Sequence, residues 1–158
     1  MLRTIVSAAL VACTIAASPA LAQSGARKAP RPAQQDFAAG QPGTPREPAI
    51  LLTVTMQETY DGRMLFAPDQ ITVKLGQQVK FQLPNLGQLE HQFVIGSVEE
   101  NARARAQGVS GKMANGTTVA PATTGDLLWR FTKPGQFEFG SLLPGQYEAG
   151  MKGTITVE

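Results

Sequence analysis

The chain has 158 residues, of which 42% are hydrophobic and 16% charged, and its formal net charge is +2. This length suits one compact domain with additional segments and argues against two domains. A charge so close to zero gives no support to nucleic acid or an anionic membrane surface as a partner.

The first residues, 1–22, have the pattern of a secretory signal peptide. Basic Arg3 precedes an apolar run over about residues 5–17, and Ala20-Leu21-Ala22 supplies small residues before a cleavage position after Ala22. The apolar run is shorter than the about 20 residues that a membrane-spanning helix needs, so we expect no membrane span. The sequence therefore predicts export to the periplasm.

Cys13 is the only cysteine of the chain, and it lies inside the predicted signal peptide. Cleavage after Ala22 would leave a mature chain with no disulfide and no thiolate. The segment Leu10-Val11-Ala12-Cys13 also has the form of a lipoprotein processing box, so lipoprotein processing at Cys13 stays open.

Residues 23–48 are rich in Pro, Ala, Gln and Gly, and Phe37 is their only large apolar residue. Such a composition buries too little apolar surface to fold. We predict a disordered linker over 23–48 that leads into one folded domain over 49–158.

From Ala49 onward, apolar and polar residues alternate between turn signals, which is typical of short strands. We expect a strand over 49–56, another near 64–69, and a hairpin in which 70–75 pairs with 78–83 around Gly76-Gln77. Further strands are expected at 91–96, 126–131, 136–139 and 151–158. About seven or eight short strands predict an all-β sandwich.

One short helix and one long loop interrupt the expected strands. Ser97-Val98-Glu99-Glu100 has capping-box spacing, which predicts a helix over about 98–106. Residues 108–124 have no clear periodicity and predict a long loop.

Three segments carry a resemblance to a known family: MLFAPDQITVKLGQQVKFQLPN, LEHQFVIG and WRFTKPGQFEFGSLLPGQYEAGMKGTITVE. They resemble the cupredoxins, especially small periplasmic copper-binding proteins related to plastocyanin and azurin. The resemblance covers about residues 64–158 and implies a Greek-key β-sandwich of the cupredoxin type. In that family a His, a Cys, a second His and a Met bind one copper ion.

The resemblance places His91 at the first His position and Met151 at the Met position. Ser141 stands at the Cys position and Gln146 at the second His position, which implies a degenerate type 1 copper site. A hydroxyl and an amide oxygen are weaker copper ligands than a thiolate and an imidazole, so we expect weak or vestigial copper binding. An imidazole and a thioether suit soft Cu(I) better than Cu(II).

Two other interpretations of these residues remain open. Met64 or Met113 would add a second thioether if either approached the site, which the sequence does not establish. Alternatively, Ser141 and Gln146 hydrogen-bond with His91 and keep the geometry of the loop without a metal.

The sequence predicts a copper-handling protein of the periplasm that is not an enzyme. The alternative is a metal-free cupredoxin-fold scaffold that binds a periplasmic protein partner, and an electron carrier is disfavoured because no thiolate is available. Residues 139–143 lack the flanking glycine pattern of a nucleophile elbow, which argues against acyl-transfer catalysis. We expect a monomer.

Overall fold

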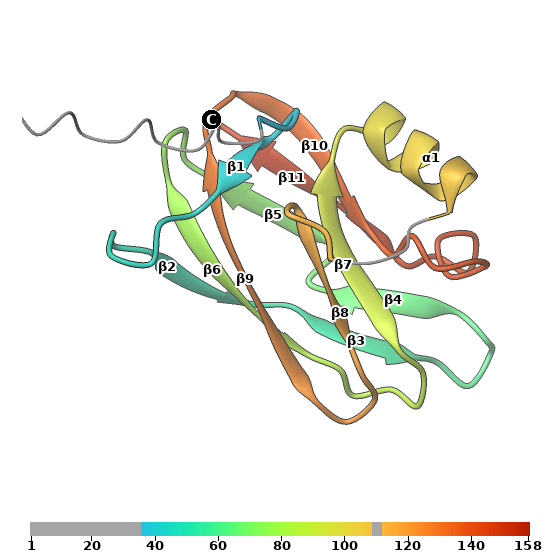
Figure 1. Ribbon diagram of the computed structural model, residues 1–158. Coiled ribbons are helices and arrows are strands. Elements are labelled where there is room, and N and C mark those ends of the chain that lie inside the picture. The colour runs from blue at the N-terminus through green and yellow to red at the C-terminus, as the bar shows by residue number, and fades with distance from the viewer. Residues whose placement is uncertain (1–35, 109–111) are drawn as a thin grey trace, which may run out of the picture. The chain divides into compact units, whose positions relative to one another are not determined.

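The computed structural model describes residues 36–108 and 112–158 (Figure 1). The predicted signal peptide, Cys13 and the first part of the predicted linker lie outside these residues. The described elements are β1 (Gly40–Pro42), β2 (Ile50–Thr53), β3 (Thr55–Glu58), β4 (Met64–Ala67), β5 (Gln70–Val73), β6 (Gln78–Pro84), β7 (His91–Gly96), α1 (Val98–Gln107), β8 (Gly116–Val119), β9 (Thr124–Phe131), β10 (Gly135–Gly140) and β11 (Lys152–Val157).

The strands form two main sheets that enclose one core. One sheet has the order β1-β9-β6-β2, the other has the order β5-β11-β10-β7-β8, and β3 pairs with β4 in a separate ribbon. Figure 1 shows α1 beside β7, near the loop that joins β10 to β11. The predicted all-β sandwich with a short helix is confirmed.

Aromatic side chains fill the space between the sheets. Phe93 of β7 lies at their centre, and its ring centroid is 5.0 Å from that of Phe139, 5.1 Å from that of Phe81 and 5.6 Å from that of Phe66. Such pairs add about 0.5–1.5 kcal/mol each beyond the burial of their surface. This packing makes β7 and β10 a rigid platform, and both strands lead into the candidate site.

The predicted hairpin of residues 70–75 and 78–83 is wrong. β5 pairs in parallel with β11, whereas β6 pairs with β9 and β2, so the two strands belong to different sheets. Gly76, with a φ of 80°, turns the chain across from one sheet to the other. A hairpin and two strands in different sheets both bury alternate residues, so the sequence pattern does not distinguish the two arrangements.

Two further strand predictions differ from the structure. The strand expected over 49–56 is divided at Val54, so that β2 joins a main sheet and β3 joins the ribbon. The loop expected over 108–124 contains β8, which pairs with β7 at the edge of its sheet. An edge strand needs little apolar sequence, and the two threonines of β8 gave no alternating signal.

The predicted helix is confirmed as α1. Ser97 Oγ accepts from Glu100 N at 3.1 Å, and Glu100 Oε2 accepts from Ser97 N at 3.0 Å, which completes the capping box. Within the described residues, no helix is long and apolar enough to cross a membrane.

Residues 36–48, here called the N-terminal strap, pack on the sandwich although the sequence predicted a disordered linker over 23–48. β1 pairs with β9, Ala39 is fully buried, and the Phe37 ring lies 5.6 Å from that of Trp129. Lys133 Nζ bonds Asp36 Oδ2 at 3.0 Å. An aromatic contact, a short edge strand and an ion pair hold the strap on the sandwich, and a prediction from composition does not detect such contacts.

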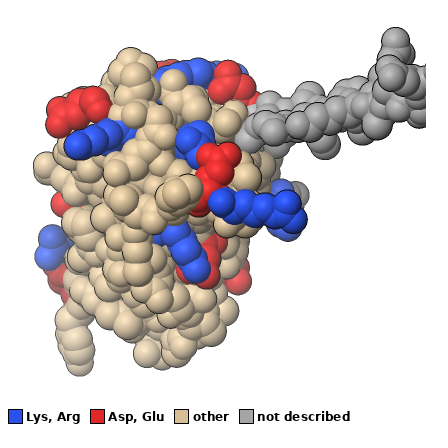
Figure 2. Space-filling view, turned by 90° about the vertical axis from the view of Figure 1, so that its left-hand side faces the viewer, with Lys and Arg blue, Asp and Glu red and all other residues tan. Residues whose placement is uncertain are grey.

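Charged side chains of both signs are interspersed on the surface that Figure 2 shows. Ion pairs join the strap to the sandwich, for example between Arg130 and Glu47 and between Lys133 and Asp36. The visible face therefore has no dominant patch of one charge.

We predict that the strap contributes to stability. The free energy of unfolding should be about 2–4 kcal/mol lower for a chain that begins at Ala49 than for one that begins at Asp36. The shorter chain loses the Phe37 contact and the β1–β9 hydrogen bonds. Urea titration followed by the fluorescence of Trp129, the only tryptophan, measures the difference. Equal midpoints for the two chains would contradict this assignment.

Candidate metal centre

The start of β7 and the β10–β11 loop (residues 141–151) meet at one end of the sandwich. β7 and β10 are antiparallel, with Gly140 opposite Val94, so the chain after Gly140 passes the first residue of β7, His91. The loop is closed on itself, because Ser141 N donates to Met151 O at 3.0 Å and Met151 N donates to Gln146 O at 3.0 Å. Register and loop closure together place the four predicted site residues in one region.

Three of these four residues are joined by side-chain hydrogen bonds. His91 Nδ1 lies 2.9 Å from Gln146 Oε1, and Ser141 Oγ donates to the same oxygen at 2.8 Å. His91 and Ser141 are fully buried, and Gln146 is nearly so. The predicted hydrogen bonding is thus confirmed for Gln146 directly, while Ser141 reaches His91 only through Gln146.

The hydrogen-bond partners determine which nitrogen of His91 carries a proton. Gln146 Nε2 donates to the backbone oxygen of Glu90 at 2.8 Å, and a carbonyl accepts only, so this contact fixes the orientation of the amide. Gln146 Oε1 therefore faces His91 Nδ1, and an amide oxygen cannot donate. Nδ1 therefore carries a hydrogen, which it donates to Gln146 Oε1.

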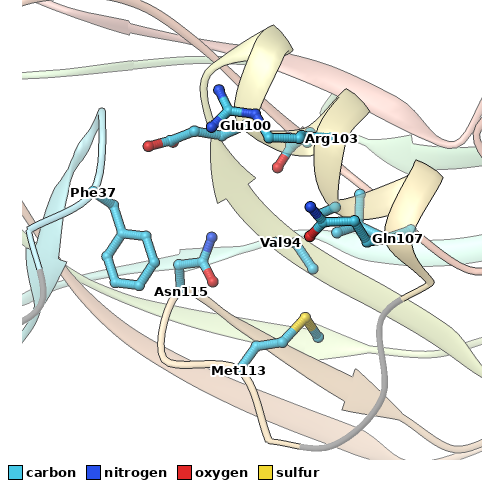
Figure 3. Close-up of a pocket in the computed structure, with 10 residues that line it drawn as sticks. Phe37, Val94, Glu100, Arg103, Gln107, Met113 and Asn115 are labelled. Atoms are coloured by element: carbon cyan, nitrogen blue, oxygen red, sulfur yellow. The ribbon is translucent and has the colours of Figure 1, made fainter.

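Met151 belongs to the same region through its backbone. Its amide and carbonyl bond the backbones of Gln146 and Ser141, and its fully buried side chain is part of the hydrophobic core. Of the two other methionines considered, Met64 lies near the loop, because its N donates to Ala149 O at 2.9 Å. Met113 instead lines a separate cavity with Phe37 and α1 (Figure 3).

Glu58, which the sequence analysis missed, faces the other nitrogen of His91. Its Oε1 lies 3.1 Å from His91 Nε2, accepts from Leu89 N at 2.8 Å, and its Oε2 accepts from Gln88 N at 2.9 Å. Burial raises the pKa of this carboxyl, but the Gln88 and Leu89 amides and His91 outweigh burial and hold its pKa below the ordinary value. The sequence around Glu58, at the end of β3, does not indicate that its carboxylate contacts His91.

Asn85 fixes the turn that leads to His91. Its Nδ2 donates to Leu89 O at 2.8 Å and to Val119 O at 3.0 Å, and its Oδ1 accepts from Gly87 N at 2.9 Å. Pro84-Asn85-Leu86-Gly87 is typical of a turn sequence, but the long-range bond to β8 gives no signal in it. Asn85 therefore holds the start of the turn, and Glu58 holds its end through the amides of Gln88 and Leu89.

Tyr147 holds the β10–β11 loop through contacts with β10 and α1. Its hydroxyl donates to Glu138 Oε2 at 2.7 Å, and Arg105 lies over its ring at 3.5 Å from the centroid. Asn101 of α1 donates to Glu138 Oε1 at 3.0 Å, which ties the helix to the same carboxylate. Burial and the bond to Glu138 raise the pKa of Tyr147.

Comparisons with known proteins agree with this architecture. A model described as copper binding proteins, plastocyanin/azurin family, matches residues 53–158. The chain is 34% identical over 155 residues to copper-resistant cuproprotein CopI of Rubrivivax gelatinosus, covering 95% of this chain and 92% of that protein. It is 30% identical over 135 residues to the CopI of Pseudomonas aeruginosa, covering 64% of this chain and 75% of that protein.

A solved structure shares the fold. Auracyanin B superposes with a TM-score of 0.62 and 22% identity, covering 74% of this chain and 94% of that chain. The predicted cupredoxin-like fold is confirmed by this likeness.

We predict that Tyr147→Phe lowers the free energy of unfolding by about 1–2 kcal/mol, because the substitution removes a hydrogen bond to a carboxylate. The raised pKa of Tyr147 means that its contribution is full below pH about 10 and is lost as pH rises through the folded-state pKa. Urea titrations at neutral and alkaline pH measure this.

Tyr60→Phe is the matched control, since Tyr60 is the other tyrosine of the chain and is fully exposed. A Tyr147→Phe variant as stable as Tyr60→Phe at neutral pH would show that the loop does not depend on this anchor.

Proposed function

Because the chain belongs to the plastocyanin/azurin family of copper-binding proteins, we propose that it is a periplasmic copper-handling protein with a degenerate type 1 copper site. The similarity to copper-resistant cuproproteins over nearly the whole chain supports a role in copper handling. The predicted signal over 1–22 supports the periplasm. The proposed activity is binding, not catalysis.

The donors in the β10–β11 loop support the degenerate site. A type 1 centre needs two imidazoles and a thiolate, with a weak axial thioether. The chain has Ser141 at the position of the family's Cys and Gln146 at the position of its second His. Its only cysteine is Cys13. These residues do not fit a blue-copper centre, since none of them supplies a thiolate or a second imidazole.

The single observation that carries the weakness of the proposed binding is the hydrogen bond between His91 Nδ1 and Gln146 Oε1 at 2.9 Å. Any metal ligated by Nδ1 competes with this bond and with the Nδ1 proton, so affinity at this side of the ring is low. His91 and Met151, with Gln146 and Ser141 in the remaining positions, offer donors that suit Cu(I) better than Cu(II). We therefore propose weak Cu(I) binding.

A metal-free scaffold is the second candidate, and the closed network favours it. Nδ1 of His91, the hydroxyl of Ser141 and the amide of Gln146 all have partners within the protein. Buried polar groups that satisfy one another keep the loop in place without an ion. In this candidate the sandwich would present its loops to a periplasmic protein partner.

We predict that the mature protein takes up Cu(I) weakly in competition with a chelator of known affinity. His91→Ala and Met151→Leu should each reduce that affinity by about ten-fold or more, because each removes a donor. Met113→Leu is the matched control and should bind as the unsubstituted protein does. If His91→Ala binds equally well, copper handling at this site is excluded and the scaffold candidate gains support.

A second prediction concerns restoration of the site. Ser141→Cys combined with Gln146→His supplies the missing thiolate and imidazole beside His91 and Met151, so Cu(II) should give an intense visible thiolate band. Each single substitution is the control and should lack the full intensity. A folded double variant that stays colourless with Cu(II) would mean that the ligand positions are wrongly assigned.

A further inference from the structure

Helix α1 is attached to the rest of the protein by polar contacts rather than by a buried apolar face. Of its ten residues, all of them described, only Asn101 is buried, and Val98, its only large apolar side chain, is 55% exposed. A cavity of about 300 Å³ lies beside the helix and is lined by Ala104, Val94 and Leu142 among others (Figure 3). A surface helix is normally held by an apolar stripe, so the few polar bonds of α1 determine how firmly it is held.

The N-terminal strap is bonded to the first turn of α1. Ala38 N donates to Glu100 Oε1 at 3.1 Å and lies 3.3 Å from Glu100 Oε2. The same side chain accepts from Ser97 N in the capping box. Hydrogen bonds to a carboxylate are about twice as strong as those between neutral groups. The strap therefore supplies a strong bond to the residue that fixes the start of the helix.

The same turn of α1 is bonded to the β10–β11 loop through Glu138. Asn101, which directly follows Glu100, donates to Glu138 Oε1 at 3.0 Å. Tyr147 of the loop donates to Oε2 of this carboxylate at 2.7 Å, and Arg105 of α1 lies over the Tyr147 ring. The strap and the loop are therefore attached to neighbouring residues of one short helix.

We propose that docking of the N-terminal strap is coupled to the order of the β10–β11 loop through α1. The strap is the element with two states, docked and released, because its attachments include a three-residue edge strand, one aromatic contact and partly exposed ion pairs. Segments held in this way open locally without unfolding of the core. When the strap opens, the first turn of α1 loses its bond to Ala38, and the contacts of the helix with Glu138 and Tyr147 weaken with it.

For copper, the consequence rests on the proposed function. The loop contains Ser141, Gln146 and Met151, so anything that displaces the strap would also loosen these three proposed ligand positions. The coupling itself is a property of the metal-free protein, and its test contains no metal. The coupling can therefore fail while Cu(I) binding holds, and Cu(I) binding can fail while the coupling holds.

Ala38→Pro removes the N–H that Glu100 accepts and leaves every residue of α1 unchanged. Ala38 is the second residue of a turn that Gly40 N closes on Phe37 O at 3.2 Å, and proline is favoured at that position. Ala38→Ser keeps the N–H and is the matched control.

The measurement is hydrogen exchange of the Ser141 and Met151 amides, whose bonds close the loop, in the metal-free mature chain. We expect both amides to exchange about five-fold faster or more in Ala38→Pro, and at the unsubstituted rate in Ala38→Ser. Phe37→Ala, which weakens the strap at its contact with Trp129, is a second variant and should accelerate the same amides.

The amide of Val54 separates the coupling from a general loss of stability. Val54 N donates to Gln82 O at 2.9 Å and belongs to neither the strap, α1 nor the loop. Its exchange should change much less than that of the loop amides. Equal acceleration of Val54 and the loop amides would show a loss of global stability alone and would overturn the proposal, as would unchanged loop amides in Ala38→Pro.

Asn101→Ala tests whether the connection runs through α1. In this variant the bond between the helix and Glu138 is already absent, so the additional effect of Ala38→Pro on the loop amides should fall below about two-fold. An effect of Ala38→Pro that is as large with Asn101→Ala as without it would exclude the connection through the helix.

Discussion

The hydrogen bond between His91 Nδ1 and Gln146 Oε1 is the interaction on which this end of the molecule depends. It joins the first residue of β7 to the β10–β11 loop, and it is buried, so the loss of either partner would leave a polar group unsatisfied at a cost of about 1–3 kcal/mol. The amide orientation that Glu90 imposes makes the bond directional. A proton on Nδ1 therefore occupies the side of the ring that faces the β10–β11 loop.

The surrounding contacts show how hydrogen bonds help to keep the loops in place. Asn85 fixes the turn before β7, Glu58 holds the amides of the same turn, and Tyr147 ties the β10–β11 loop to Glu138 and hence to α1. Glu58 belongs to β3, whereas Asn85 and Tyr147 lie in the turn and in the loop that they hold. Because they act on both loops, contacts within the protein position the site residues, and these contacts are the basis of the scaffold candidate.

Much of the fold could be predicted from the sequence, because β6, β9 and β11 bury alternate residues and the capping box marks the start of α1. Which strands pair was not predictable where alternation fits either sheet, as for β5 and β6, nor where polar edge strands carry no pattern, as for β1 and β8. The convergence of His91, Ser141, Gln146 and Met151 followed from the family resemblance. Glu58 was missed because only the tertiary structure brings β3 beside the turn before β7.

His91 has two faces with different physical constraints. The Nδ1 face is closed by an oriented amide and a hydroxyl, so binding there must first break a satisfied network. The Nε2 face has the Glu58 carboxylate at 3.1 Å, which the Gln88 and Leu89 amides hold in place. Gln146 thus keeps a hydrogen on Nδ1, while Glu58 lies beside the other ring nitrogen. The ring is therefore held from both sides, by the β10–β11 loop at Nδ1 and by Glu58 of β3 at Nε2.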